Sequence, residues 1–139
     1  MASAILNLPV GAFVTMITPF EASTNSIDWK NVDKLVEFYL SNGICGIFTV
    51  CLSSEMYQLS EEERLQLATR IVNKVHGRVP VVAVGNMGET IDEQAESIKK
   101  MYKTGVQCVV INVSTICKQE EGISTKIGCF LIIINEKKR

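Results

Sequence analysis

Residues 51–55, Cys-Leu-Ser-Ser-Glu, hold the densest group of side chains that could take part in chemistry. The adjacent hydroxyls of Ser53 and Ser54 could donate hydrogen bonds to a substrate carboxylate, together with nearby backbone N–H groups. Glu55 could act as an acid and Cys51 as a nucleophile. The same residues are also typical of a turn in which the serines satisfy their own backbone and the thiol is inert. Both interpretations stay open.

Positioning these side chains requires a regular frame, and short apolar runs alternate along the chain with longer amphipathic ones. The apolar runs predict four strands, at residues 13–17, 44–50, 79–84 and 106–113. Three helices are predicted to begin at Asp28 and at the capping boxes Ser60/Glu63 and Thr90/Glu93, and to end at Gly43, Gly77 and Gly105. Strands that alternate with helices pair in parallel, so the pattern predicts an α/β fold whose parallel sheet is covered on both faces.

Ligands of parallel α/β folds gather at the carboxyl ends of the strands. The segments at these ends are residues 18–20, 51–55, 85–88 and 113–116. We expect Thr18, Ser53, Ser54 and Glu55 to bind substrate there, and we interpret Tyr57 as a packing residue. None of the four segments matches a glycine-rich phosphate loop, which argues against a nucleotide site.

Composition excludes several classes of partner. The chain has 139 residues, of which 47% are hydrophobic and 21% charged, as in an ordinary soluble globular domain. A formal net charge of -1 gives no electrostatic basis for binding nucleic acid or an anionic membrane. The first twenty residues are uncharged, but Pro9, Gly11 and Pro19 interrupt them and no basic segment precedes them. We therefore expect a buried strand there and neither an export signal nor a membrane span.

The cysteines and the single histidine limit the remaining chemistry. Five cysteines without a Cys-x-x-Cys pair favour neither a disulfide framework nor a zinc site. We expect free thiols that pack as small hydrophobic groups in a reducing, cytoplasmic setting. His76 cannot form a two-histidine site alone, so no metal is expected.

A family resemblance rests on five motifs that succeed one another between residues 11 and 113. The motifs are Gly-Ala-Phe-Val-Thr-Met-Ile-Thr-Pro-Phe at 11–20, Ile-Asp at 27–28, Ser-Asn-Gly-Ile-Cys-Gly-Ile-Phe at 41–48, Glu-Met-Tyr-Gln-Leu-Ser-Glu-Glu-Glu-Arg at 55–64 and Gly-Arg-Val-Pro-Val-Val-Ala at 77–83. Together they resemble the dihydrodipicolinate synthase and N-acetylneuraminate lyase family. The ordered succession makes the resemblance more specific than any single motif.

The resemblance implies a (β/α)8 TIM barrel, usually a homotetramer, that forms or cleaves carbon–carbon bonds of 2-oxo acids such as pyruvate. A lysine on the sixth strand forms a Schiff base with the 2-oxo acid, and the imine stabilises the carbanion without a metal or organic cofactor. This chain would supply a partial barrel of about four strands and three helices over residues 11–116. Residues 1–10 would form an N-terminal extension and residues 117–139 a divergent tail.

Two segments depart from the family pattern. Where the family usually has Gly-Thr-Thr-Gly-Glu or Gly-Ser-Thr-Gly-Glu, this chain keeps the second hydroxyl at Ser53 and the acid at Glu55, but Leu52 cannot relay a proton. Some divergent members resemble this version, which indicates a subgroup with an altered substrate. After the fourth strand, Val-Ser-Thr at residues 113–115 replaces the usual Pro-Tyr-Tyr, whose tyrosine contacts a neighbouring subunit.

The residues that the resemblance makes catalytic, a tyrosine on the fifth strand and the Schiff-base lysine on the sixth, belong beyond the matching region. The lysines that follow the fourth strand lie in a polar linker or a charged terminal segment, which does not lower a lysine pKa as imine formation requires. These lysines are Lys118, Lys126, Lys137 and Lys138. No catalytic residue is therefore assigned in this chain.

Three hypotheses follow. The chain is a truncated, catalytically incomplete form of a pyruvate-type lyase or aldolase; it is a non-enzymatic fragment that associates with itself or with a full-length subunit; or it is a flavodoxin-like binding module, which the missing phosphate loop disfavours. A four-stranded partial barrel leaves two unpaired edges and an apolar inner face unless another half or the tail covers them. We therefore expect a homo-oligomer or association with a full-length subunit, and not a stable monomer.

Overall fold

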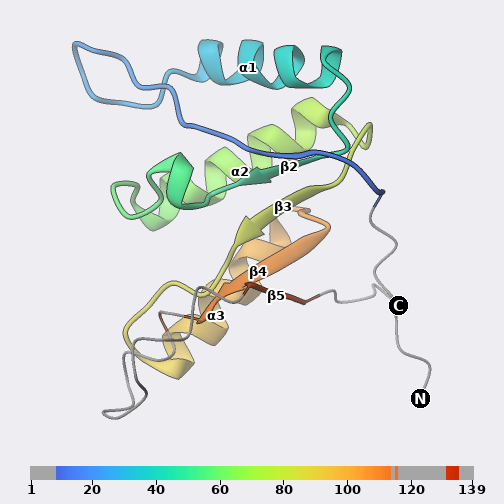
Figure 1. Ribbon diagram of the computed structural model, residues 1–139. Helices are drawn as coiled ribbons and strands as arrows, with labels where there is room; N and C mark the ends of the chain where they lie inside the picture. The colour runs from blue at the N-terminus through green and yellow to red at the C-terminus, as the bar shows by residue number, and fades with distance from the viewer. Residues whose placement is uncertain (1–8, 114, 116–130, 135–139) are drawn as a thin grey trace, which may run out of the picture.

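The computed structural model describes residues 9–113, 115 and 131–134, the last four by their backbone alone. The elements follow in the order β1 (Phe13–Thr15), α1 (Trp29–Ser41), β2 (Gly46–Thr49), η1 (Leu52–Ser54), α2 (Glu61–Val75), β3 (Val81–Val84), α3 (Ile91–Lys103), β4 (Cys108–Asn112) and β5 (Leu131–Ile134). Figure 1 shows the three helices beside the sheet in chain order. The predicted alternation of four strands and three helices is confirmed.

The sheet has the order β1-β2-β3-β4-β5, and the first four strands are parallel. Its last strand, β5, runs antiparallel to β4, with Asn112 opposite Leu131 and Val109 opposite Ile134. In Figure 1, β5 lies along the outer side of β4. We expected association because the partial barrel would leave two sheet edges unpaired. β5, which belongs to the predicted tail, pairs with one of these two edges. The proposed domain boundaries at residues 10 and 116 stay predictions.

The helices begin where local sequence predicts. The Asp28 carboxylate accepts a hydrogen bond from the Asn31 backbone N–H at 3.0 Å, and α2 and α3 both begin with complete capping boxes. Each helix ends two residues before its predicted glycine, and His76 itself takes the left-handed conformation that ends α2. The strands are shorter than predicted: β2, β3 and β4 begin two residues later, and β1, β2 and β4 end one or two residues earlier.

The main core lies between the sheet and the helices. Strand register places the side chains of Met16, Thr49, Ala83 and Val109 on one face. This face packs against the helices, because a Cβ at Gly85 would overlap Val109 and lie next to Ile98 of α3. All four residues of β3 are buried, as expected for a strand covered on both faces.

The opposite face of the sheet is covered unevenly. Register places Thr15, Phe48, Val82 and Cys108 on it. Val82 and Cys108 are buried, whereas Phe48 is half-buried and Thr15 is exposed. The β1 side of this face is therefore the more open one. Among the described residues, no helix combines the length and the apolar character that crossing a membrane requires.

Candidate functional site at the carboxyl ends of the strands

The chain turns sharply where β2 ends. Val50 and Glu55, on either side of η1, have left-handed backbone conformations with φ of 46° and 55°. This region is rare for a β-branched residue, and the Val50 side chain is fully buried. Strained backbone persists only where surrounding packing holds it, and it clusters at functional sites. The strained turn therefore marks the carboxyl end of β2 as a candidate functional site.

Three polar side chains hold the turn against the end of β1. The Ser54 hydroxyl donates to the Met16 carbonyl at 2.6 Å, and the Thr18 hydroxyl donates to the Ser54 carbonyl at 2.9 Å. Cys51 Sγ lies 3.4 Å from Ser54 Oγ. Ser54, Thr18 and Cys51 are all buried. Ser54 and Thr18, both predicted to bind substrate, thus use their hydroxyls within the protein.

The other residues of the turn point outward. Ser53 and Glu55 are exposed, and the Leu52 side chain is 63% exposed. The structure thus divides the four candidate substrate-binding residues into a buried pair, Thr18 and Ser54, and an exposed pair, Ser53 and Glu55. Of the two adjacent serines, only Ser53 is exposed to solvent.

The ends of β3 and β4 are joined through one buried amide. Asn86 accepts a hydrogen bond from the Asn112 N–H at 2.7 Å and donates to the Asn112 carbonyl at 2.9 Å. Its Nδ2 also lies 3.3 Å from Gln94 Oε1 in the first turn of α3, and Gln94 donates to the Gly88 carbonyl. Asn86 and Gln94 are almost completely buried. This network fixes the two strand ends next to the turn.

Tyr57 connects the turn to the end of β4. Asn112 Nδ2 donates to the Tyr57 hydroxyl at 3.3 Å, while the Tyr57 side chain is 58% exposed. Tyr57 is therefore a polar contact at the strand ends and not only the packing residue that we predicted. The sequence offered no signal for this contact, because the two residues are 55 positions apart. Asn86, in contrast, lies in a strand-end segment that we had singled out.

The described residues offer no imine-forming lysine. No lysine among them is buried, and Lys74 and Lys100 are ion-paired with Glu37 and Glu61. Lys118, Lys126, Lys137 and Lys138 lie outside the described residues. Imine formation requires a buried lysine whose neutral amine can attack a carbonyl carbon.

The described thiols and acids do not suggest other chemistry. Cys45, Cys51 and Cys108 are free thiols, and burial raises the pKa of Cys108, which makes it less reactive. No group of three or more potential metal ligands occurs in the part of the chain that the structure describes.

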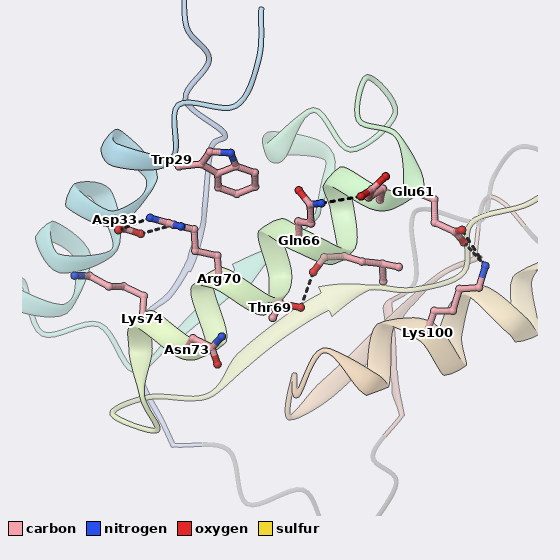
Figure 2. Close-up of a pocket in the computed structure, with 11 residues that line it drawn as sticks. Trp29, Asp33, Glu61, Gln66, Thr69, Arg70, Asn73, Lys74 and Lys100 are labelled. Carbon is pink, nitrogen blue, oxygen red and sulfur yellow. Dashed lines mark hydrogen bonds and ion pairs between the residues drawn. The ribbon is translucent and has the colours of Figure 1, made fainter.

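A groove of about 1010 Å³ lies on the helical side of the sheet and is lined by residues of α1, α2 and α3. Figure 2 shows Arg70 next to Trp29 and Asp33. Arg70 makes two hydrogen bonds with the Asp33 carboxylate, at 2.8 and 2.9 Å, and its guanidinium carbon lies 5.6 Å from the Trp29 ring centroid. Lys100 pairs with Glu61 at 2.9 Å. These charged groups bind one another, and no strand residue lines the groove, so the strand ends remain the candidate site.

The sequence profile of the Dihydrodipicolinate synthetase family matches residues 8–115. The chain belongs to this family. The match includes β1 to β4 and stops before β5. It confirms the resemblance inferred from the five motifs.

Two curated relatives are 4-hydroxy-tetrahydrodipicolinate synthases. The protein of Marinobacter nauticus is 33% identical over 103 residues, which are 74% of this chain and 35% of the relative. The second such synthase of Halalkalibacterium halodurans is 38% identical over 95 residues, 68% of this chain and 32% of the relative. This chain therefore spans about a third of the length of the curated relatives that it matches.

Solved structures agree on the fold. The dihydrodipicolinate synthase from Oceanobacillus iheyensis superposes with a TM-score of 0.64 at 41% identity, covering 70% of this chain and 32% of that one. The chloride-inhibited enzyme from Acinetobacter baumannii, complexed with pyruvate, gives 0.67 at 29% identity, covering 73% of this chain and 34% of that one. The predicted partial TIM barrel, with four parallel strands and three helices, is confirmed.

Proposed function

We propose that this chain forms the 2-oxo acid binding part of a pyruvate-type Schiff-base aldolase or lyase and is catalytically incomplete by itself. The observation that carries the proposal is the exposed hydroxyl of Ser53 on a turn that buried hydrogen bonds hold at the carboxyl end of β2. Membership of the family and the relatives named as synthases support it. The pyruvate in the Acinetobacter baumannii complex is a substrate of the class proposed here.

The residues of the turn would divide the work. Ser53 would donate a hydrogen bond to the carboxylate of the 2-oxo acid, while Thr18 and Ser54 hold the backbone in place. Glu55, exposed beside them, would accept hydrogen bonds from the substrate or its loop. Leu52 presents an apolar side chain where a hydroxyl would be needed to pass a proton, so the turn would bind and not relay protons.

The covalent step would need a lysine from elsewhere. A neutral amine attacks the ketone carbon, water leaves, and the protonated imine accepts the electron pair of the breaking or forming carbon–carbon bond. No described lysine lies in the buried position that would lower its pKa enough to be neutral. We therefore propose that turnover requires the part of the family's barrel that this chain does not cover.

We also propose a cytoplasmic protein that associates with other subunits. Free thiols at Cys45, Cys51 and Cys108 support a reducing compartment. The alternative function is a non-enzymatic one, in which the partial barrel associates with itself or with a full-length subunit. The open β1 side of the inner face, with exposed Thr15 and half-buried Phe48, favours that alternative.

One experiment separates the two functions. Purified chain is incubated with pyruvate and borohydride, intact mass is measured, and pyruvate binding is followed by NMR titration. We expect no covalent adduct, and we expect weak binding that Ser53→Ala abolishes and Ser26→Ala, an exposed loop serine, leaves intact. A stoichiometric adduct would show that a lysine of this chain is competent. Absence of binding would put the non-enzymatic role first.

A further inference from the structure

The outer edge of β4 is filled in an unexpected way. β4 is the last strand within the family match, which ends at residue 115, and β5 lies 16 positions beyond that point. β5 nevertheless pairs with β4 over four residues, from Asn112 opposite Leu131 to Val109 opposite Ile134. It runs antiparallel, whereas β1 to β4 are parallel. A segment that the family match does not include therefore occupies this edge.

The hydrogen bonds between β4 and the β3 side show which backbone groups of β4 point toward β3. The remaining groups point toward β5. The Val110 carbonyl accepts from the Gly85 N–H at 3.1 Å, and both backbone groups of Asn112 bind Asn86. Val110 and Asn112 thus direct their polar groups toward β3. Alternate residues of a strand direct these groups to opposite sides. Val109 and Ile111 therefore direct theirs toward β5.

The register then distinguishes the residues of β5. Ile132 lies opposite Ile111 and Ile134 opposite Val109, so the N–H groups of Ile132 and Ile134 face β4. Ile133 lies opposite Val110, in a pair that exchanges no backbone hydrogen bond, and its N–H faces away from β4.

We propose that the β4 edge is a docking site for a short apolar strand, filled by the chain's own β5 and open to β5 of a second copy by strand exchange. Without an occupant, unpaired N–H and C=O groups of β4 would lie beside the buried Val109 and Ile111. β5 consists of Leu and three Ile and carries no charge that would oppose its pairing with either copy. A second copy of the chain carries the same β5 sequence, so its β5 fits this edge equally well.

The connection between the strands permits both arrangements. Residues 113–130 number eighteen, and a chain of that length reaches at most about 60 Å when extended. A tether of this length gives β5 a high effective concentration at its own β4, so the intramolecular arrangement dominates in dilute solution. Exchange between copies grows as the protein concentration approaches that effective concentration.

A cross-strand disulfide tests the docking and the exchange in the full chain. Val110→Cys with Ile133→Cys joins a pair without backbone hydrogen bonds, in which Cα atoms come close enough for a disulfide. Val110→Cys with Ile132→Cys, one position out of register, is the control. Unlabelled and ¹⁵N-labelled chains are mixed, oxidised with oxidised glutathione and mapped by peptide mass spectrometry.

We expect the 110–133 link within one chain in dilute solution, and the fraction of links between labelled and unlabelled chains to rise about tenfold with a tenfold increase in concentration. The out-of-register control forms neither link. Equal linkage in both variants, or none in the first, would overturn docking at this edge. Links that stay within one chain at every concentration would overturn the exchange.

Proline substitutions provide a second test that needs no engineered cysteine. Ile132→Pro removes an N–H that faces β4, whereas Ile133→Pro removes one that faces away. In hydrogen exchange, we expect the amides of Val109 and Ile111 to lose protection about tenfold or more in Ile132→Pro and much less in Ile133→Pro. If the two variants give the same protection at these amides, β5 does not occupy the β4 edge.

Discussion

The side-chain amide of Asn86 binds both backbone groups of Asn112, at 2.7 and 2.9 Å, and so extends the pairing of β3 and β4 beyond the last residue of β3. Asn112 in turn donates to Tyr57, which follows the turn after β2. The carboxyl ends of three strands are thus connected through Asn112 and Asn86, and Asn86 is 1% exposed.

Replacing Asn86 should therefore destabilise the fold. Asn86→Ala removes the hydrogen bonds of Asn86 with the N–H and the carbonyl of Asn112, and we expect the free energy of unfolding to fall by about 2 kcal/mol. Urea denaturation followed by circular dichroism measures the change. Asn73→Ala, at an exposed position of α2, is the matched control and should leave stability unchanged. Equal losses in the two variants would contradict the role assigned to Asn86.

The two adjacent serines should respond differently to the same substitution. Ser54→Ala removes a buried hydroxyl that donates to the Met16 carbonyl, so we expect a loss of about 1–2 kcal/mol in the free energy of unfolding. Ser53→Ala changes an exposed side chain and should alter stability by less than about 0.5 kcal/mol. Chemical denaturation compares both with the unchanged protein. A larger loss for Ser53→Ala would reverse our assignment of the two hydroxyls.

Acid should weaken the contact between α1 and the end of α2. The hydrogen bonds from Arg78, with a further contribution from Lys74, lower the pKa of Glu37 to about 2. A carboxylate whose pKa is lowered by folding stabilises the folded state above its unfolded pKa, and this contribution is lost as pH falls from about 4.5 to about 2. The stabilisation is therefore present at neutral pH.

Glu37→Gln measures that contribution. We expect the difference in urea midpoint between the unchanged protein and Glu37→Gln to be constant above pH 5 and to shrink toward pH 2, as linkage requires. Glu96→Gln, in an exposed pair with Lys99 on α3, is the control and should change the urea midpoint less at neutral pH. A difference that grows on acidification would show that the sign is wrong.

The capping box of α3 supports the loop that carries Asn86. The Thr90 hydroxyl accepts from the Glu93 N–H at 3.2 Å, and the Glu93 carboxylate accepts from the N–H groups of Thr90 and Glu89. We expect Thr90→Ala to lower the free energy of unfolding by about 1 kcal/mol. Thr90→Ser keeps a hydroxyl at the cap and should lose much less stability. Thermal or urea denaturation distinguishes them. Equal effects of the two substitutions would mean that the hydroxyl does not cap the helix.

The sequence predicts the frame well because its signals are local. Asp28, Ser60 and Thr90 each lie three residues before the N–H group that they bind, so helix starts can be recognised from spacing alone. The strand ends are less predictable, because an apolar residue such as Val50 can continue the pattern of a strand while its backbone already turns.

The site is only partly predictable for a related reason. Sequence places Ser53 and Ser54 in the right turn, but which hydroxyl faces inward depends on Met16, 38 positions away. The pairing of β5 depends likewise on a strand from another part of the chain, and its direction cannot be deduced from an apolar run. Contacts between distant residues decide both points, and local patterns do not contain them.

The hydrogen bonds of Thr18 and Ser54 order the turn during folding, before any ligand binds. A ligand at the site proposed for Ser53 would therefore meet a backbone that loses little further conformational entropy, which would leave more of the contact energy for affinity. The inward residues maintain the turn, and the outward residues Leu52 and Ser53 can change without refolding it. Substrate preference at this loop can thus diverge among family members while the stability of the fold is preserved.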